Sequence, residues 1–160
     1  MPYATTKGWR FRAAAYALAL AVTAGVPVAA AQTVQCPGNA CDVTVKVEGD
    51  PARPTITVSA QELRMKKGAA NPVITWKLVA PAGFEFRQAS ISPHTGAPTG
   101  RKGTTTQAEW DDQCTRLNTS GTEIRIRNRN TKATTLFYNV TVFNAAGRAF
   151  PIDPAIVNDP

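Results

Sequence analysis

Residues 73–79 read Val-Ile-Thr-Trp-Lys-Leu-Val, and they decide the fold class of this chain. The side chains of Ile74, Trp76 and Leu78 fall on one face of an extended strand, because successive strand residues point to opposite faces. A Pro-Ala-Gly sequence at 81–83 then ends the run. We expect this segment to be the central strand of a β-sheet.

The same two-residue alternation recurs along the chain, and helical periodicity is almost absent. The further strand segments expected are 43–47, 56–59, 63–65, 84–86, 124–126 and 136–143, with short strands also at Ile91 and Trp110. We expect the segments at 124–126 and 136–143 to form a hairpin. Pro151 and Pro154 argue against a central strand in the C-terminal tail. Together these patterns predict an all-β sandwich of about seven to nine strands.

Residues 1–31 have the layout of a cleavable secretory signal peptide. Three basic residues precede an uncharged run of 14 residues at 13–26, and alanines at 29–31 form an A-x-A cleavage site. A transmembrane anchor needs about 20 apolar residues, so this run is too short to serve as one. We expect cleavage before Gln32, export to the periplasm or the cell exterior, and no transmembrane span in the mature chain.

Removal of the signal peptide leaves residues 32–160, which are expected to form a single domain. The removed segment holds three of the 18 basic side chains and none of the 11 acidic ones. The remaining 15 basic and 11 acidic side chains give a formal net charge of +4, instead of +7 for the whole chain. Nucleic acid is therefore not an expected partner, because its binding needs a concentrated positive surface.

All three cysteines lie in the mature part, and an oxidising compartment allows a disulfide to persist there. Cys36 and Cys41 flank a turn-forming Pro-Gly-Asn sequence, which favours a local bridge between them. A longer bridge from either one to Cys114 is the alternative. With the local bridge, Cys114 is free, buried or available to another chain. A structural zinc site is not expected, because the chain has one histidine and no second cysteine pair.

Several motifs spread over the mature chain resemble those of small exported proteobacterial proteins with no established activity. These motifs are Ile74–Leu78, Phe84–Phe86, Trp110–Asp112, Phe137–Val140 and Ile152–Asn158. The resemblance implies a cupredoxin-like or immunoglobulin-like sandwich, and it implies no function.

The chain departs from the site patterns of both of these folds. A blue-copper centre needs two histidines and a cysteine, but His94 is the only histidine and no histidine or methionine follows Cys114. Immunoglobulin domains place a tyrosine two residues before the second cysteine, where this chain has Asp112. No cofactor is therefore expected.

Two polar clusters are candidates for catalytic chemistry. Glu109, Asp111 and Asp112 surround Trp110, and glycoside hydrolysis uses two carboxylates at a set separation. Neighbouring strand residues diverge, so we expect a solvated turn there. His94 lies close to Ser92, and histidine is a common general base, but no third group that would orient the histidine is evident. A small periplasmic hydrolase is therefore the weaker hypothesis, and a surface histidine the expected role.

Arg125, Arg127 and Arg129 share one face of an expected strand, about 7 Å apart. Such a row is suited to a polyanion, for example an acidic glycan or lipid phosphates of the cell envelope. The alternative is that these charges face solvent and keep an edge strand from pairing with other chains.

The sequence thus predicts an exported, non-catalytic β-sandwich that acts as a binding or structural module. Binding sites on such scaffolds lie mostly in end loops, and the loop at 93–103 is the first place to search. A polyanion-binding module that uses the arginine row is the more specific form of this hypothesis.

Overall fold

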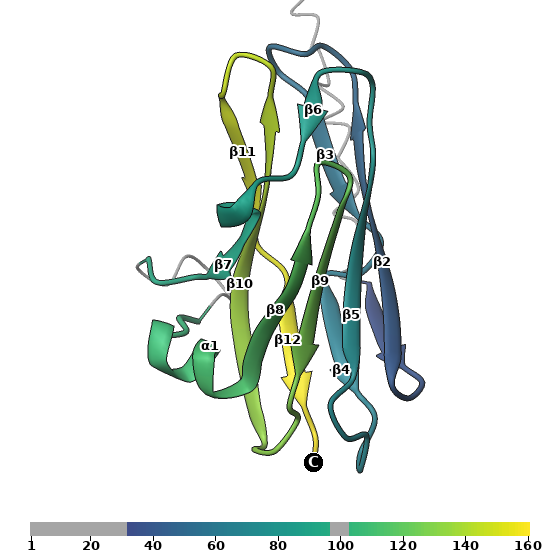
Figure 1. Cartoon of the computed structure of the whole chain (residues 1–160), viewed down its shortest axis with the longest axis vertical. Coiled ribbons are helices and arrows are strands. Elements are labelled where there is room, and N and C mark those ends of the chain that lie inside the picture. The colour runs from purple at the N-terminus through teal and green to yellow at the C-terminus, as the bar shows by residue number, and fades with distance from the viewer. Residues whose placement is uncertain (1–31, 97–102) are drawn as a thin grey trace, which may run out of the picture.

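The computed structural model describes residues 32–96 and 103–160. The expected signal peptide at 1–31 and most of the loop at 93–103 lie outside the described residues. The described residues form two β-sheets packed together, as expected for an all-β sandwich (Figure 1). Their buried apolar side chains form a core cluster between the sheets.

One sheet has five strands, with β5 at its centre. Its strands, in spatial order, are β3 (Thr55–Val58), β2 (Ala40–Glu48), β5 (Val73–Val79), β9 (Glu123–Asn128) and β8 (Cys114–Thr119). Strand β5 pairs in parallel with β2 and antiparallel with β9. The expectation that residues 73–79 form a central strand is therefore confirmed.

The other sheet is organised around the longest strand, β10 (Thr134–Asn144). Its remaining strands are β1 (Thr33–Cys36), β4 (Glu62–Met65), β6 (Phe84–Glu85), β7 (Ile91–Pro93), β11 (Ala149–Ile152) and β12 (Ala155–Asn158). Strands β11 and β12 continue one antiparallel register along β10, since Val140 pairs with Ile152 and Phe137 with Ala155. Strands β6 and β7 pair with β10 as well, joined by a short 3-10 helix.

The structure corrects the expected number of strands. The described residues contain twelve strands rather than seven to nine, because breaks divide the partners of β10 into short pieces. The C-terminal tail also departs from expectation, since β12 lies between β4 and β10. Pro154 does not prevent this position because it precedes the strand, where no ladder N–H is missing.

Strands β9 and β10 do not form the expected hairpin, because they belong to different sheets. The side chain of Asn128 points into the sandwich and accepts a hydrogen bond from the backbone N–H of Asn130 at 2.9 Å. Asn130 has a φ of 50°, in the left-handed region that asparagine tolerates. Its side-chain amide donates to the carbonyl of Ala69 at 3.1 Å. These bonds fix the chain where it crosses from one sheet to the other.

Trp110 lies on a helix and not on the expected short strand. Helix α1 spans Gln107–Gln113 and starts at a capping box, in which Thr106 and Glu109 bond to each other's backbone N–H groups. The side chain of Trp110 is buried and its ring centre lies 5.8 Å from that of Tyr138 on β10. The helix therefore attaches to the core through this tryptophan.

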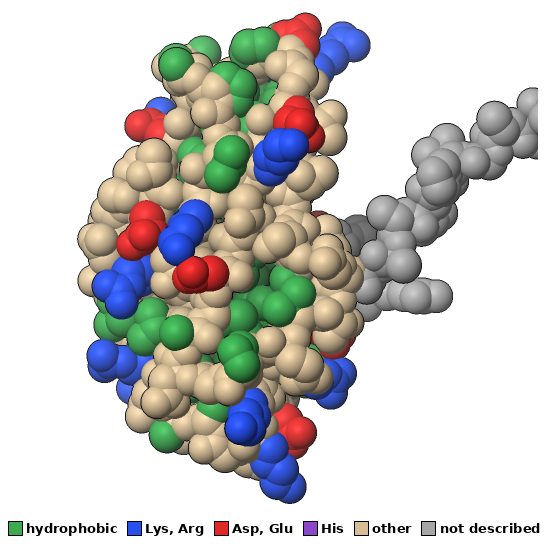
Figure 2. Space-filling model, turned by 90° about the vertical axis from the view of Figure 1, so that its right-hand side faces the viewer, with side chains coloured by type: hydrophobic (Ala, Val, Ile, Leu, Met, Phe, Trp, Pro, Cys, Tyr) green, Lys and Arg blue, Asp and Glu red, His purple; other side chains and the backbone are tan. Residues whose placement is uncertain are grey.

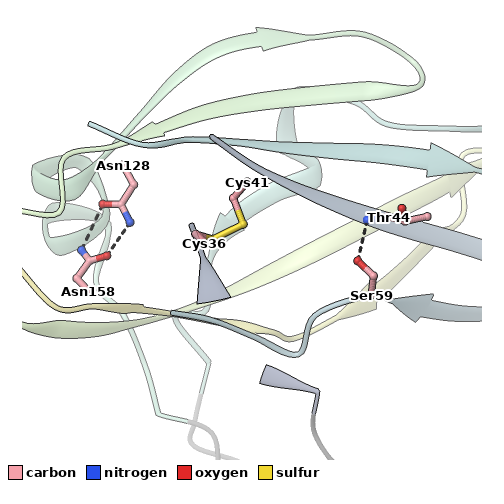
Figure 3. The surroundings of a disulfide bond; sticks show 6 residues. All are labelled: Cys36, Cys41, Thr44, Ser59, Asn128 and Asn158. Carbon is pink, nitrogen blue, oxygen red and sulfur yellow. Dashed lines mark hydrogen bonds between the residues drawn. A yellow bond between two sulfur atoms is a disulfide. The ribbon is translucent and has the colours of Figure 1, made fainter. Parts of the chain in front are cut away.

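Two covalent or polar links join the sheets (Figure 3). The disulfide between Cys36 and Cys41 connects β1 to β2, which belong to different sheets, so the local bridge favoured by the turn is present. The buried amides of Asn128 on β9 and Asn158 on β12 exchange hydrogen bonds of 2.7 and 3.3 Å. Gln113 accepts a further bond from Asn158 at 3.3 Å, which ties the end of α1 to the same network.

We expect Asn128→Ala to lower the free energy of unfolding by about 2 kcal/mol, because it leaves the buried polar groups of Asn158 and Asn130 without their partner. Urea denaturation of both proteins measures this difference. The matched control is Asn118→Ala on the exposed side of β8, which should change stability by less than about 0.5 kcal/mol. Equal effects of the two variants would contradict a structural role for the amide network.

Candidate functional site

Arg125 and Arg127 lie exposed on the outer face of β9, while Ile124 and Ile126 are buried beneath them. Strand β9 is an interior strand, flanked by β5 and β8. The alternative interpretation is therefore correct in one part and wrong in the other: these arginines face solvent, but they do not protect a sheet edge, because β9 has a neighbouring strand on each side.

The two arginines differ from the lysines on the same sheet face in having no acidic partner. Lys77 pairs with Asp42 at 2.8 Å, and Lys46 pairs with Glu48 at 2.7 Å. In register, Arg125 lies between Thr75 and Asn118, and Arg127 lies between Val73 and Thr115. Across the described part of the chain, neither guanidinium takes part in an ion pair. We call Arg125 and Arg127 the arginine pair.

Arg129 does not continue this row in the same way. It follows the last residue of β9, and its backbone N–H donates to the carbonyl of Gln113 on α1. Asp112 on that helix forms an ion pair with Lys132 at 2.7 Å. Hydrogen bonds from Lys132 and Gln113 lower the pKa of Asp112, and the charge of Arg129 acts in the same direction. The charge of Arg129 is thus partly balanced, and the uncompensated row contains two arginines.

Figure 2 shows a side of the molecule on which positive and negative side chains are interspersed. No large patch of a single sign covers that side.

The acidic cluster occupies α1 instead of a solvated turn, and its three carboxylates have different partners. Glu109 caps the helix, and its pKa is lowered by the hydrogen bonds from the backbone N–H and the hydroxyl of Thr106. Asp111 accepts a bond from Gln107 at 2.8 Å, whereas Asp112 binds Lys132. The described residues contain no group of three or more side chains able to hold a metal ion. Glu109 and Asp112 both line a second cavity of about 250 Å³, but Thr106 holds the first carboxylate and Lys132 the second. The glycosidase hypothesis gains no support from this arrangement, because both carboxylates are already engaged by groups of the protein.

His94 lies beside β10 in a setting that does not match a hydrolase. Its Nδ1 atom is 3.1 Å from the side-chain oxygen of Asn139, and the half-buried ring is not the surface histidine that was expected. The Nε2 atom is buried and has no hydrogen-bond partner among the described residues, so no serine lies within hydrogen-bond reach of it. Ser92 pairs in register with Asn139 along β7. The hypothesis of a hydrolase based on His94 gains no support from this geometry.

A cavity that the sequence did not predict lies along the side of the sandwich, between β7, β8 and α1. Its volume is about 280 Å³. It is lined by Gln88, Ala89, Ile91, Ser92, Pro93, Gln107, Trp110, Asp111, Cys114, Arg116 and Ile126. We call it the seam cavity, because Arg116 on β8 closes the seam between the sheets by donating to the carbonyl of Ile91 at 2.6 Å.

Cys114 is the free cysteine and lies buried in the wall of the seam cavity. Burial raises the pKa of its thiol to about 12, and the nearby charge of Asp111 adds to this effect. Because the thiolate is the nucleophilic form, this cysteine is protonated and unreactive at neutral pH. The cavity is thus suited to binding rather than to thiol chemistry.

One available sequence signal would have revealed the helix that forms one wall of this cavity. Thr106-Gln-Ala-Glu109 matches the capping-box pattern that marks the start of a helix. Recognition of that helix would have placed Trp110 and Asp111 on one element. That α1 and Arg116 line the same cavity depends on tertiary packing, which local sequence patterns do not indicate.

We expect the Cys114 thiol of the native protein to resist a thiol-specific reagent at neutral pH, because it is buried and its pKa is raised. Unfolding in denaturant without reductant should release one reactive thiol per chain, since the other two cysteines are bridged. Absorbance of the released chromophore measures both states. Rapid labelling of the native protein would contradict the burial of Cys114.

A scan of the chain against models of known protein families gives no match, and a search of curated protein sequences gives none either. Functional inference for this chain therefore depends on its own residues and geometry.

Proposed function

We propose that this chain is an exported, non-catalytic β-sandwich protein that binds a polyanion through the arginine pair, Arg125 and Arg127. Export is supported by the signal-like layout of residues 1–31 and by the disulfide between Cys36 and Cys41, a bond typical of oxidising compartments. Within the described residues, no helix is long and apolar enough to cross a membrane. The cupredoxin-like or immunoglobulin-like relationship stays a prediction from the resemblance.

The observation that carries the proposal is the contrast in charge pairing on one sheet face. Both lysines on the outer face of β2 and β5 have an acidic partner, and the arginine pair on neighbouring β9 has only threonine, asparagine and valine beside it in register. The Cα atoms of the two arginines lie about 7 Å apart along one strand, so their side chains leave the same face close to each other. Their charge is therefore available for a ligand.

The geometry favours a ligand with repeated anionic groups. Guanidinium groups form paired hydrogen bonds with carboxylate, sulfate and phosphate oxygens, and their forked donors suit an extended chain of such groups. The threonine and asparagine side chains beside the arginines add neutral donors and acceptors. An acidic glycan of the cell envelope matches this chemistry.

We expect the purified protein to bind immobilised heparin at physiological salt and Arg125→Ser combined with Arg127→Ser to elute at clearly lower salt. Two lost ion contacts should reduce the slope of log affinity against log salt by about two. The matched control is Lys46→Ser combined with Lys77→Ser, which removes the same charge from the same sheet face. Equal shifts in the two double variants, or no retention of the unmodified protein, would overturn the proposal.

Export is tested separately by intact-mass analysis of the protein recovered from outside the cytoplasm. We expect a chain that starts at Gln32, carries one disulfide and takes up one alkylating group in denaturant without reduction. Peptide mapping should place the disulfide between Cys36 and Cys41. A mass that retains residues 1–31 would contradict cleavage, whatever the outcome of the heparin experiment.

A further inference from the structure

We propose that the seam cavity binds a small zwitterion, such as a free α-amino acid, with Arg116 facing the carboxylate and Asp111 facing the ammonium group. This site is independent of the arginine pair, which projects from the outer face of β9. The inference rests on the two opposite charges that line one cavity without pairing with each other.

Arg116 is a partly buried cation, and the groups that accept its hydrogen bonds are neutral. Its guanidinium donates to the carbonyl of Ile91 at 2.6 Å and to the hydroxyl of Thr119 at 3.1 Å. Within the described residues, it has no acidic partner, although a cation that is withdrawn from water usually has one. Burial lowers its pKa, in agreement with a site that would gain from an anion. A guanidinium has five N–H donors, so donors remain for a ligand carboxylate.

Asp111 supplies the opposite charge from the helix side of the cavity. Its recorded hydrogen bond comes from the neutral amide of Gln107 at 2.8 Å. Asp111 and Arg116 both line the seam cavity, yet they form no ion pair with each other. Two opposite charges that border one cavity without touching leave room for a molecule that carries both complementary charges.

The remaining wall is mixed in character. Trp110 lines the cavity beside Ile91 and Ile126, whose side chains are almost fully buried, and Ser92 and Gln107 add polar groups. A lining of this kind between two opposite charges suits a small molecule that carries both complementary charges better than a single salt ion. The volume of about 280 Å³ restricts the ligand to a small molecule.

The test is a titration of the ¹⁵N-labelled protein with L-leucine at millimolar concentration, followed by NMR. We expect shifts of the Trp110 indole and Arg116 Nε signals. Two analogues isolate the charges: 4-methylpentanoate lacks the ammonium group and 3-methylbutylamine lacks the carboxylate. Each analogue should bind at least about tenfold more weakly than leucine, since each leaves one charged group of the site unpaired.

Asp111→Asn provides the matched variant, because its side-chain oxygen can still accept the bond from Gln107. It should weaken leucine binding about tenfold and leave binding of 4-methylpentanoate unchanged. The control is Asp112→Asn, which makes the same change one position along α1, at a residue outside the seam cavity. Both variants keep Arg116 and its hydrogen bond to the carbonyl of Ile91, so a change in leucine affinity does not come from the loss of that bond.

Three outcomes would overturn the proposal. The first is the absence of shifts at Trp110 and Arg116 on addition of leucine. The second is equal affinity for leucine and for 4-methylpentanoate, which would show that Asp111 does not recognise an ammonium group. The third is an equal effect of Asp111→Asn and Asp112→Asn. None of these outcomes bears on heparin binding by the arginine pair.

Discussion

The contact between Trp76 and Tyr138 is the constraint on which the rest of the molecule depends. Trp76 lies at the centre of the five-stranded sheet and Tyr138 at the centre of the longest strand of the other sheet, and both are fully buried. Their rings meet edge to face with centres 5.7 Å apart, a favourable geometry for aromatic pairs. Trp110 packs on the other side of Tyr138 and attaches α1 to the core. These three packed aromatic side chains therefore set the spacing of the sheets and the position of the seam cavity.

Around this aromatic core, different interactions close different parts of the sandwich. The disulfide joins β1 to β2, the amide network joins β9, β12 and α1, and Arg116 joins β8 to the strand at Ile91. Each of these interactions joins strands that belong to different sheets and therefore share no backbone hydrogen bonds. The seam cavity exists because Arg116 and α1 close the side of the sandwich at separate points and leave space between them.

The proposed binding functions use charge in two different environments. The arginine pair lies on an open sheet face in contact with water, so its attraction for a polyanion depends on repeated contacts and weakens with salt. Arg116 and Asp111 border a small cavity, and the guanidinium of Arg116 is half-buried, so a single ligand charge counts for more beside it than on the open sheet face. A polyanion does not fit into the seam cavity, and a small zwitterion would gain little from the exposed arginines. The two sites therefore differ in ligand class for physical reasons.

Local sequence patterns determined several of the main strands of this protein and part of its site. Alternation of apolar and polar residues was sufficient to predict the central strand at 73–79, the burial of the isoleucines beneath the arginine pair, and the all-β class. The Pro-Gly-Asn turn was sufficient to favour the disulfide between Cys36 and Cys41. These features depend on neighbours within a few residues. The capping box at Thr106 was readable as well, although strand alternation was applied there instead.

Only the tertiary structure decided which strands became neighbours. The transfer of the chain from β9 to the other sheet depends on buried amides whose partners are up to 64 residues away in sequence. The interior position of β9, and hence the availability of its arginines for a ligand, follows from that pairing. The meeting of Asp111 with Arg116 in one cavity likewise requires that the sheets and α1 pack together. Periodicity tells which side of a strand is buried, but it carries no information about the element that buries it.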